Sequence, residues 1–198
     1  MAQPTTLRLE ISPEDSARLL RLAAVAGPSP RRPTTRRLAV TYFDTPDRQL
    51  RSAGVVLEIR RSGRRHVQIV RVAGTMVDGE RINRDWENPL ATAEPDPSAV
   101  DDIDLRRLIT PLPGLRLEPV LRLDLRRISR RLMPAEDQEI LVTVHTGEAE
   151  DGTAVPAFCE VVLTLRAGPP VLLFDLARAI HTEIPLRVAT EPFERRAL

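Results

Sequence analysis

The clearest pattern along this chain is the alternation of apolar and polar residues in several short runs. Leu7, Leu9 and Ile11 alternate with Arg8 and Glu10. A period of two is typical of a β-strand that packs one face against a core and leaves the other face polar. Similar runs, bounded by Gly, Pro or Asp, predict further strands at 37–43, 55–61, 66–72, 81–90, 117–129, 139–145 and 158–166.

Helical segments are set among these strands. Ser12 offers a cap, Pro13 takes the first helical position and two acids follow, so a helix is expected from there to Gly27. Further helical segments are expected at 46–53, 100–109 and 170–183. About eight strands with helices between them predict one α+β domain over residues 1–198, built on a meandering antiparallel sheet.

The polar faces of these strands leave two arrangements open. Arg122 and Arg126 share the polar face of one strand, and Glu160 lies on the polar face of another. In the first arrangement these faces meet water and the arginines pair with nearby acids. In the second, the strands close into a barrel with their polar faces inward, which forms a charged tunnel suited to a polyanion. Alternation alone does not choose between them.

Composition narrows the classes of function. The chain has 29 basic and 28 acidic residues, and this near balance argues against a general nucleic-acid coat. It has no stretch of about 18 apolar residues, so no membrane span is predicted. Cys159 is the only cysteine, which excludes an internal disulfide and makes a cytoplasmic location the simplest expectation. Every basic residue is arginine, which can grip phosphate through two hydrogen bonds but does not act as a base.

One long stretch carries a family resemblance. YFDTPDRQLRSAGVVLEIRRSGRRHVQIVRVAG, at 42–74, resembles the CYTH domain, also called the triphosphate tunnel metalloenzyme fold. Members typically show an aromatic-aromatic-Asp-Thr-Pro segment, a glycine turn, an Arg-x-Arg strand and a strand ending in Lys. Later family segments are matched in the same order by NRDWENPL at 83–90, PVLRLDLRR at 119–127 and FCEVVLTLRAG at 158–168.

The resemblance implies an eight-stranded antiparallel closed barrel, or tunnel, with helices packed on the outside. It also implies a triphosphate-containing ligand and Mg²⁺ or Mn²⁺. The matching positions give a set of substrate-binding arginines, with Arg127 as the alternative to the last of them: Arg8, Arg60, Arg71, Arg122 and Arg126. The candidate metal ligands are Glu160, Glu10 and Glu87.

This sequence departs from the family pattern at several charged positions. The opening Glu-x-Glu-x-Lys becomes PTTLR at 4–8, the acidic strand keeps only Glu160, and the first arginine of Arg-x-Arg is Glu58. A divalent cation needs oxygen ligands, mainly carboxylates, so the metal site is expected to be degenerate. The remaining glutamates can instead pair with arginines, because buried charges are normally paired.

Three functions are therefore expected to compete. The first is a phosphoanion-binding tunnel for triphosphate, polyphosphate or a nucleotide, with weak or absent hydrolysis. The second is a metal-dependent inorganic triphosphatase with a reduced ligand set, which would make the chain a phosphoanhydride hydrolase. The third is a non-catalytic scaffold whose partner is another protein. No membrane partner or specific nucleic-acid partner is expected, and the sequence does not indicate an oligomeric state.

Overall fold

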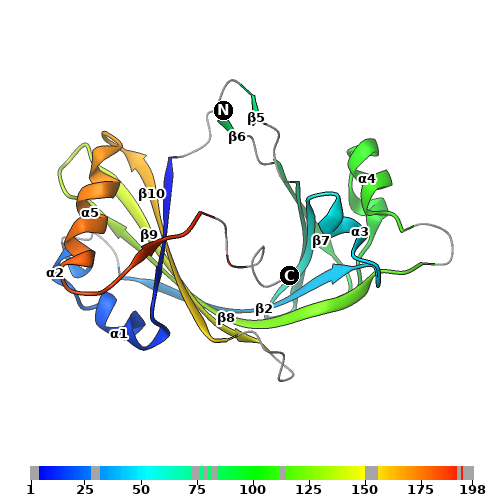
Figure 1. Ribbon diagram of the computed structural model, residues 1–198, viewed down its shortest axis with the longest axis horizontal. Coiled ribbons are helices and arrows are strands. Elements are labelled where there is room, and N and C mark those ends of the chain that lie inside the picture. Colours follow the sequence, from blue (N-terminus) through cyan, green and yellow to red (C-terminus); the bar gives the residue numbers. More distant parts are fainter. Residues whose placement is uncertain are drawn as a thin grey trace. The chain divides into compact units, whose positions relative to one another are not determined.

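The protein is described by a computed structural model that covers residues 5–27, 32–72, 76–77, 80–81, 84–111, 115–149, 156–190 and 193 (Figure 1). Its strands are β1 (Thr6–Ile11), β2 (Thr34–Asp44), β3 (Val55–Ser62), β4 (Arg65–Val72), β5 (Met76–Val77), β6 (Glu80–Arg81), β7 (Arg84–Leu90), β8 (Glu118–Leu132), β9 (Glu139–Ala149), β10 (Phe158–Ala167) and β11 (Arg187–Val188). Its helices are η1 (Pro13–Asp15), α1 (Ser16–Leu19), α2 (Ala23–Ala26), α3 (Gln49–Ser52), η2 (Pro97–Ala99), α4 (Ile103–Ile109) and α5 (Val171–His181).

The main sheet has nine strands in the order β11-β1-β10-β9-β8-β2-β3-β4-β7, and β5 pairs separately with β6. The predicted α+β class with an antiparallel sheet is confirmed, but the sheet has one strand more than the eight predicted. The additional strand, β11, pairs with Leu9 and Glu10 of β1. It is two residues long, which is too short for alternation to reveal it.

Closure of the sheet is not established. Strands β11 and β7 stand at the two ends of the order, and no pairing between them occurs among the residues that the structure describes. The described strands therefore do not show the closed barrel expected from the family resemblance.

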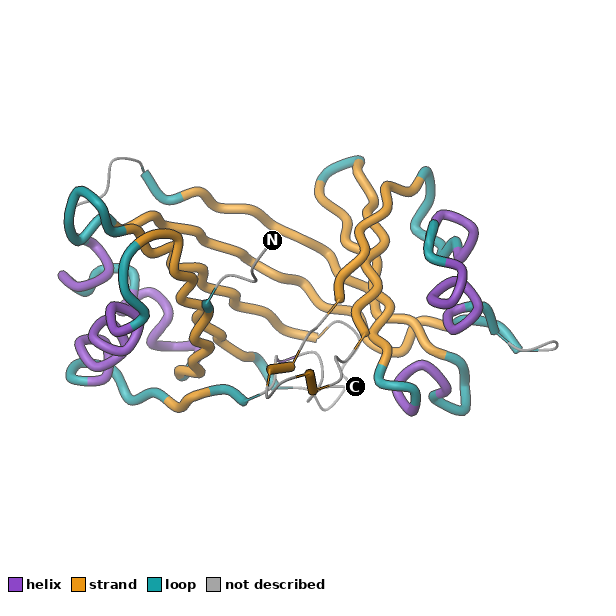
Figure 2. The backbone as a smooth tube through the Cα atoms, turned by 90° about the horizontal axis from the view of Figure 1, so that it is seen from above, coloured by secondary structure: helices purple, strands orange, loops and turns teal. Residues whose placement is uncertain are grey.

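The chain divides into two compact units. Unit 1 consists of Met1–Arg37, Leu125–Glu148 and Ala154–Ala197, and unit 2 consists mainly of Leu38–Asp124. Strands β2 and β8 contribute residues to both units because the boundaries fall inside them. Figure 2 shows the helices of each unit gathered on one side of that unit's strands.

The core of unit 1 lies between its strands and α5. Leu9 pairs with Val161, and Leu7 pairs with Leu163, so these apolar side chains share one face of the β1–β10 ladder. Helix α5 follows Pro169 and Pro170 and places four side chains in the buried region: Leu173, Leu176, Ala177 and Ile180. The polar residues between the apolar ones consequently lie on the opposite face.

The core of unit 2 is built in the same way. Leu57 of β3 pairs with Val70 of β4, and both are almost fully buried with Phe43. Leu50 of α3 and Leu105 of α4 pack into the same cluster. Helices thus cover the apolar face of this unit too, and the polar face of β3 and β4 lies on the other side.

The prediction of one continuous helix from Ser12 to Gly27 is wrong, because three short helical segments occupy these residues. The Ser12 side chain caps no backbone N–H, and its hydroxyl donates to the Glu14 carboxylate at 3.0 Å. Leu22 then adopts an extended ψ of 135°, which breaks the helix before α2. None of the described helices is long and apolar enough to cross a membrane.

Candidate functional site

The Asp-Thr-Pro segment fixes the connection that leads into β3. The Asp44 carboxylate is buried and accepts hydrogen bonds from the backbone N–H of Thr45 (2.8 Å), Leu50 (2.9 Å) and Arg51 (3.1 Å). These bonds satisfy N–H groups at the start of α3, which have no acceptor within the helix. Gly54 then ends the turn with a φ of 70°, a conformation that favours glycine. Asp44 therefore has a structural role, and the chain enters β3 in a fixed register.

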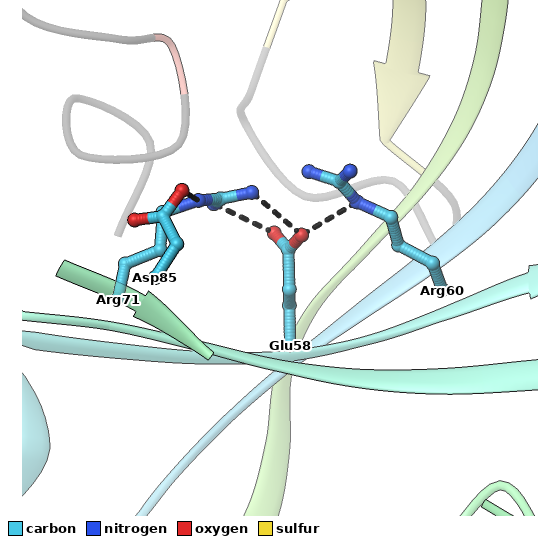
Figure 3. Close-up of polar contacts among 4 residues, drawn as sticks. All are labelled: Glu58, Arg60, Arg71 and Asp85. Carbon is cyan, nitrogen blue, oxygen red and sulfur yellow. Dashed lines mark hydrogen bonds and ion pairs between the residues drawn. The ribbon is translucent and has the colours of Figure 1, made fainter. Parts of the chain in front are cut away.

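A cluster of four charged side chains occupies the polar face of unit 2 (Figure 3). Glu58 of β3 is fully buried, and its carboxylate accepts two hydrogen bonds from Arg71 of β4, at 3.0 and 3.2 Å. Arg60 Nε lies 2.6 Å from Glu58 Oε1. This contact is an ion pair, since its N–H is not aligned for a hydrogen bond. Asp85 of β7 adds a second carboxylate 3.5 Å from Arg71 Nε.

The registers of the strands explain why these residues meet. Glu58 pairs with Ile69, and Arg71 pairs with both Val56 and Asp85, which places all of these side chains on one face. Two carboxylates and two guanidinium groups make the cluster neutral overall. Burial of Glu58 without its arginines would be costly, because an isolated buried carboxylate loses its hydration.

Arg60 is the member of this cluster that remains open to a ligand. Its side chain is 31% exposed, and in Figure 3 no dashed line reaches its two terminal nitrogens. No described residue forms a hydrogen bond or ion pair with these two atoms. A guanidinium held at Nε presents its other edge as a two-pronged donor for an anion.

A second charged row crosses the polar face of unit 1. Glu10 of β1 pairs with Glu160 of β10, and Glu160 pairs with His145 of β9. Arg8 Nη1 donates to Glu160 Oε2 at 3.1 Å, and Arg187 Nη2 donates to Glu10 Oε2 at 3.1 Å. His145 Nδ1 lies 3.9 Å from Glu160 Oε2. Each carboxylate of this row therefore has an arginine of its own.

The two expected arginines of β8, Arg122 and Arg126, belong to different units. Arg122 is exposed in unit 2, where it lines a groove with Thr41, Phe43 and Leu117. Arg126 is exposed and belongs to unit 1. A Cβ on Gly147 would collide with the side chains of Leu125 and Phe158.

Because Gly147 pairs with Phe158 and its Cβ would also meet Leu125, these three residues lie on one face of the sheet. This is the face that carries the polar residues of unit 1. Phe158 shares this face with Glu160, two residues along β10. Alternation then puts Arg127 on the polar face, and Arg126 on the face of the buried Ile128. Of the two alternatives that the resemblance left open, Arg127 is the one directed toward the charged row.

Glu87 of β7 lies in unit 2, opposite Ile69, on the same strand face as Asp85. It is exposed, and no described side chain forms an ion pair with it. Glu10 and Glu160 belong to unit 1. The structure thus brings two of the three expected metal ligands together on paired strands and assigns the third to the other unit.

The paired glutamates fit a metal ion poorly. Mg²⁺ commonly takes one or two carboxylates together with water and phosphate oxygens, so the number of ligands alone would suffice. However, Arg8 and Arg187 already neutralise Glu160 and Glu10. No group of three or more His, Cys, Asp or Glu side chains suited to a metal occurs within the described part of the chain.

The alternation pattern gave no indication of an aromatic contact beside the charged row. The rings of Phe158 and Phe193 stack with centroids 3.4 Å apart and an interplanar angle of 11°. Both rings line a cavity of about 460 Å³ together with Glu10, Glu160 and Arg187. The only sequence signal is Gly147, which pairs with Phe158 and leaves room above the strand for the rings.

Cys159 points to the opposite side of β10, into the core of unit 1. Burial raises the pKa of its thiol from 9.0 to about 12, and the nearby carboxylates of Glu160 and Asp15 add to the rise. The thiol therefore stays protonated at neutral pH, as is typical of a side chain that packs in a core.

Comparison with known families decides the identity of this arrangement. The model of the CYTH domain matches residues 5–197. The chain belongs to the CYTH family. This CYTH domain combines the family's aromatic-Asp-Thr-Pro turn and arginine strands with charged clusters in which buried glutamates are paired.

Solved structures with the same fold are distant in sequence. HpAC1 from Hippeastrum, an adenylyl cyclase candidate with a dominant triphosphatase activity, is 15% identical with a TM-score of 0.60, over 97% of this chain and 93% of its own. An adenylate cyclase candidate from Bacillus halodurans is 14% identical with a TM-score of 0.59, over 98% and 96%. The PH1012 protein from Pyrococcus horikoshii OT3 is 14% identical with a TM-score of 0.52, over 96% and 97%. A search of curated proteins found no match.

Proposed function

We propose that this CYTH domain binds a phosphoanion, namely triphosphate, polyphosphate or a nucleotide, and hydrolyses it weakly or not at all. In this proposal the nine-stranded sheet closes into a tunnel that the polar faces of its strands line. The principal ligand contact is Arg60, whose terminal edge is open. The other proposed contacts are Arg8, Arg71, Arg122 and Arg127 in place of Arg126, and there the ligand would share Arg8 and Arg71 with the glutamates that hold them. Family membership supports the class of ligand, and the two charged clusters support the location.

One observation carries the proposal. Arg60 is fixed at Nε by the buried Glu58 and has two terminal nitrogens with no protein partner among the described residues. Such a guanidinium has already lost much of its conformational freedom, so binding of an anion costs less side-chain entropy. Two parallel N–H groups match two oxygens of one phosphoryl group.

Weak hydrolysis follows from the same side chains. Attack of water on a phosphoanhydride needs a group that orients the water and cations that neutralise the developing charge. Arginine does not accept a proton at neutral pH. Glu10, Glu58 and Glu160 are each engaged by at least one arginine, so none of these carboxylates is poised to accept a proton or hold a cation. We therefore expect the protein to bind the phosphoanion with little or no release of phosphate.

The pairing of Glu10 with Glu160 favours a second candidate, a metal-dependent inorganic triphosphatase with a reduced ligand set. Two carboxylates directly opposite each other on neighbouring strands repel when both are charged. Metal chemistry at this position would require Arg8 and Arg187 to leave them.

A titration with tripolyphosphate separates the candidates. The melting temperature and phosphate release are followed with and without Mg²⁺ or Mn²⁺. A rise in melting temperature without phosphate release supports the proposal, because a ligand that binds the folded state raises its stability. Release that depends on the metal supports the triphosphatase. No rise and no release would leave the protein-binding scaffold as the remaining function.

Two neighbouring arginines on β3 give a matched test of the site. Arg60 lies on the polar face, and the exposed Arg61, which pairs with Ala39 and His66, lies on the other face. Arg60→Ala is expected to weaken tripolyphosphate binding by at least about tenfold, because a charge-assisted contact contributes roughly 1.5–3 kcal/mol. Arg61→Ala removes the same charge and is expected to change binding by less than about twofold. Equal effects of the two substitutions would place the site elsewhere.

A further inference from the structure

In the cluster of unit 2, the Glu58 carboxylate takes the position on Arg71 that a bound anion would take. Arg71 donates to both of its oxygens, at 3.0 and 3.2 Å, which is the geometry in which a guanidinium also holds a phosphoryl group. The remaining Arg71 nitrogen, Nε, lies 3.5 Å from Asp85. The nitrogens of Arg71 are therefore engaged by protein carboxylates, and the terminal edge of Arg60 is the part of this cluster open to a ligand.

The charge of the cluster determines which phosphoryl groups the terminal edge of Arg60 can bind. The formal charges of Arg60 and Arg71 are balanced by those of Glu58 and Asp85, so this cluster adds no net positive charge beside a phosphoryl group that approaches Arg60. Glu58 is fully buried and water does not screen it well, so its repulsion of a nearby anion is stronger than that of a surface acid. Each additional negative charge on the phosphoryl group increases this repulsion.

We infer that Glu58 is a specificity-determining residue, because its fixed negative charge favours phosphoryl groups of low charge at Arg60. The inference rests on the proposed phosphoanion binding and narrows its ligand class. Phosphoryl groups within a chain or ring carry one negative charge, whereas a terminal phosphoryl group carries a second charge near neutral pH. The site therefore favours internal phosphoryl groups, as in polyphosphate or a cyclic phosphate, over terminal ones.

Two probes with the same number of phosphorus atoms test this selection. Trimetaphosphate is a ring of internal phosphoryl groups, and tripolyphosphate has two terminal ones. Binding of each is measured by calorimetry at fixed pH and low, constant ionic strength, without divalent cations. The wild type is expected to bind trimetaphosphate at least as tightly as tripolyphosphate, although tripolyphosphate carries more charge.

Glu58→Gln removes the negative charge and keeps the shape and an amide oxygen that can still accept from the arginines. It is expected to tighten tripolyphosphate binding on the order of tenfold and trimetaphosphate binding by clearly less, because repulsion scales with the charge of the ligand. Asp104→Asn is the matched control. It removes the same formal charge from unit 2 at a side chain that is 95% exposed on α4, and should leave both affinities unchanged.

Glu58→Gln leaves two arginines short of a partner, so the variant could fail to fold. Asp85→Asn then serves as the second variant. Its side chain is 54% exposed, and it removes a carboxylate from the same cluster without emptying a buried position. It is expected to tighten tripolyphosphate binding by roughly threefold, a smaller effect because its charge is better screened by water.

The outcomes distinguish this inference from the proposed function. Tighter tripolyphosphate binding in Glu58→Gln, or in Asp85→Asn if the first does not fold, supports the selection by charge. Unchanged or weaker tripolyphosphate binding in the folded variant, with clear binding to the wild type, overturns the inference and leaves the proposed function standing. Absence of binding of both probes to the wild type and to the folded variants overturns the proposed function itself.

Discussion

At the scale of single residues, this protein stabilises buried carboxylates in two different ways. Asp44 accepts hydrogen bonds from three backbone N–H groups, whereas Glu58 and Glu160 are held by arginine side chains. The first arrangement is local, since the donors follow Asp44 within seven residues. The second depends on distant segments, since Arg8 and Glu160 are 152 residues apart. Local arrangements of this kind can be anticipated from sequence, and distant ones cannot.

Asp44 gives a prediction at this scale. Asp44→Ala leaves the N–H groups of Thr45, Leu50 and Arg51 without this acceptor and should lower the free energy of unfolding by roughly 2–4 kcal/mol. Chemical denaturation measures the change.

The control for this prediction is Asp47→Ala. The Asp47 carboxylate is exposed and accepts only from the side chains of Thr45 and Gln49 in the described contacts, so its removal should change stability much less. Equal losses for the two variants would contradict a capping role for Asp44.

At the scale of secondary-structure elements, the strands follow the alternation closely and the helices follow their sequence signals less well. Asp102 caps α4 by accepting from Leu105 N–H at 2.9 Å, so the helix begins at Ile103 and not at Val100. Strand β3 continues through Ser62, one residue past the expected strand end at 61, and the turn to β4 lies at Gly63 and Arg64. These differences arise because a cap or turn depends on which side-chain oxygen and which φ the local packing selects.

The segment between β7 and α4 is attached to the sheet by one buried amide. The Gln68 side chain is fully buried, its Nε2 donates to Asp96 O at 2.9 Å, and its Oε1 accepts from Asp96 N–H at 2.8 Å. This reciprocal pair holds the start of η2 against β4. The proline-rich segment that precedes α4 is therefore a docked part of unit 2.

Gln68→Leu tests this attachment. The substitution preserves size but leaves the Asp96 backbone without both of these partners, so unfolding free energy should fall by roughly 2–4 kcal/mol. Hydrogen exchange should also become faster at Asp96. Gln49→Leu, at a site where the amide contacts the exposed Asp47, should have little effect on either measurement. Unchanged exchange at Asp96 in Gln68→Leu would show that the segment is held by other contacts.

At the scale of the whole molecule, two cores share one sheet. The buried clusters of unit 1 and unit 2 have no member in common, but β2 and β8 run through both units. An element that belongs to two units couples their unfolding, because its backbone hydrogen bonds cannot be lost in one half without loosening the other. We therefore propose that residues 1–198 unfold as one cooperative domain.

The single tryptophan makes this proposal measurable. Trp86 packs against the core of unit 2, and Leu163 is fully buried in unit 1. Leu163→Ala should destabilise the protein by roughly 2–5 kcal/mol, because it leaves a cavity in the core. The midpoints from Trp86 fluorescence and from far-ultraviolet circular dichroism should fall together. A Trp86 midpoint that stays in place while the other falls would show that the two units unfold independently.

The sequence by itself determined the period-two strands, the Asp-Thr-Pro turn and membership of the CYTH family, because these depend on neighbouring residues and on their order along the chain. Through the family resemblance it also named Arg8 and Arg60 as expected ligand-binding residues. Alternation assigns a side chain to a face, but it does not say which side chain lies opposite on the next strand.

Only the tertiary structure decided the partners of those charges. Strand register placed Glu10 opposite Glu160, and it placed Glu58 between Arg60 and Arg71. It also directed Arg127 toward the polar face of unit 1, where the resemblance had not separated it from Arg126. The physical reason is that Coulomb interactions and hydrogen bonds depend on distances of a few ångströms between strands that are far apart in sequence.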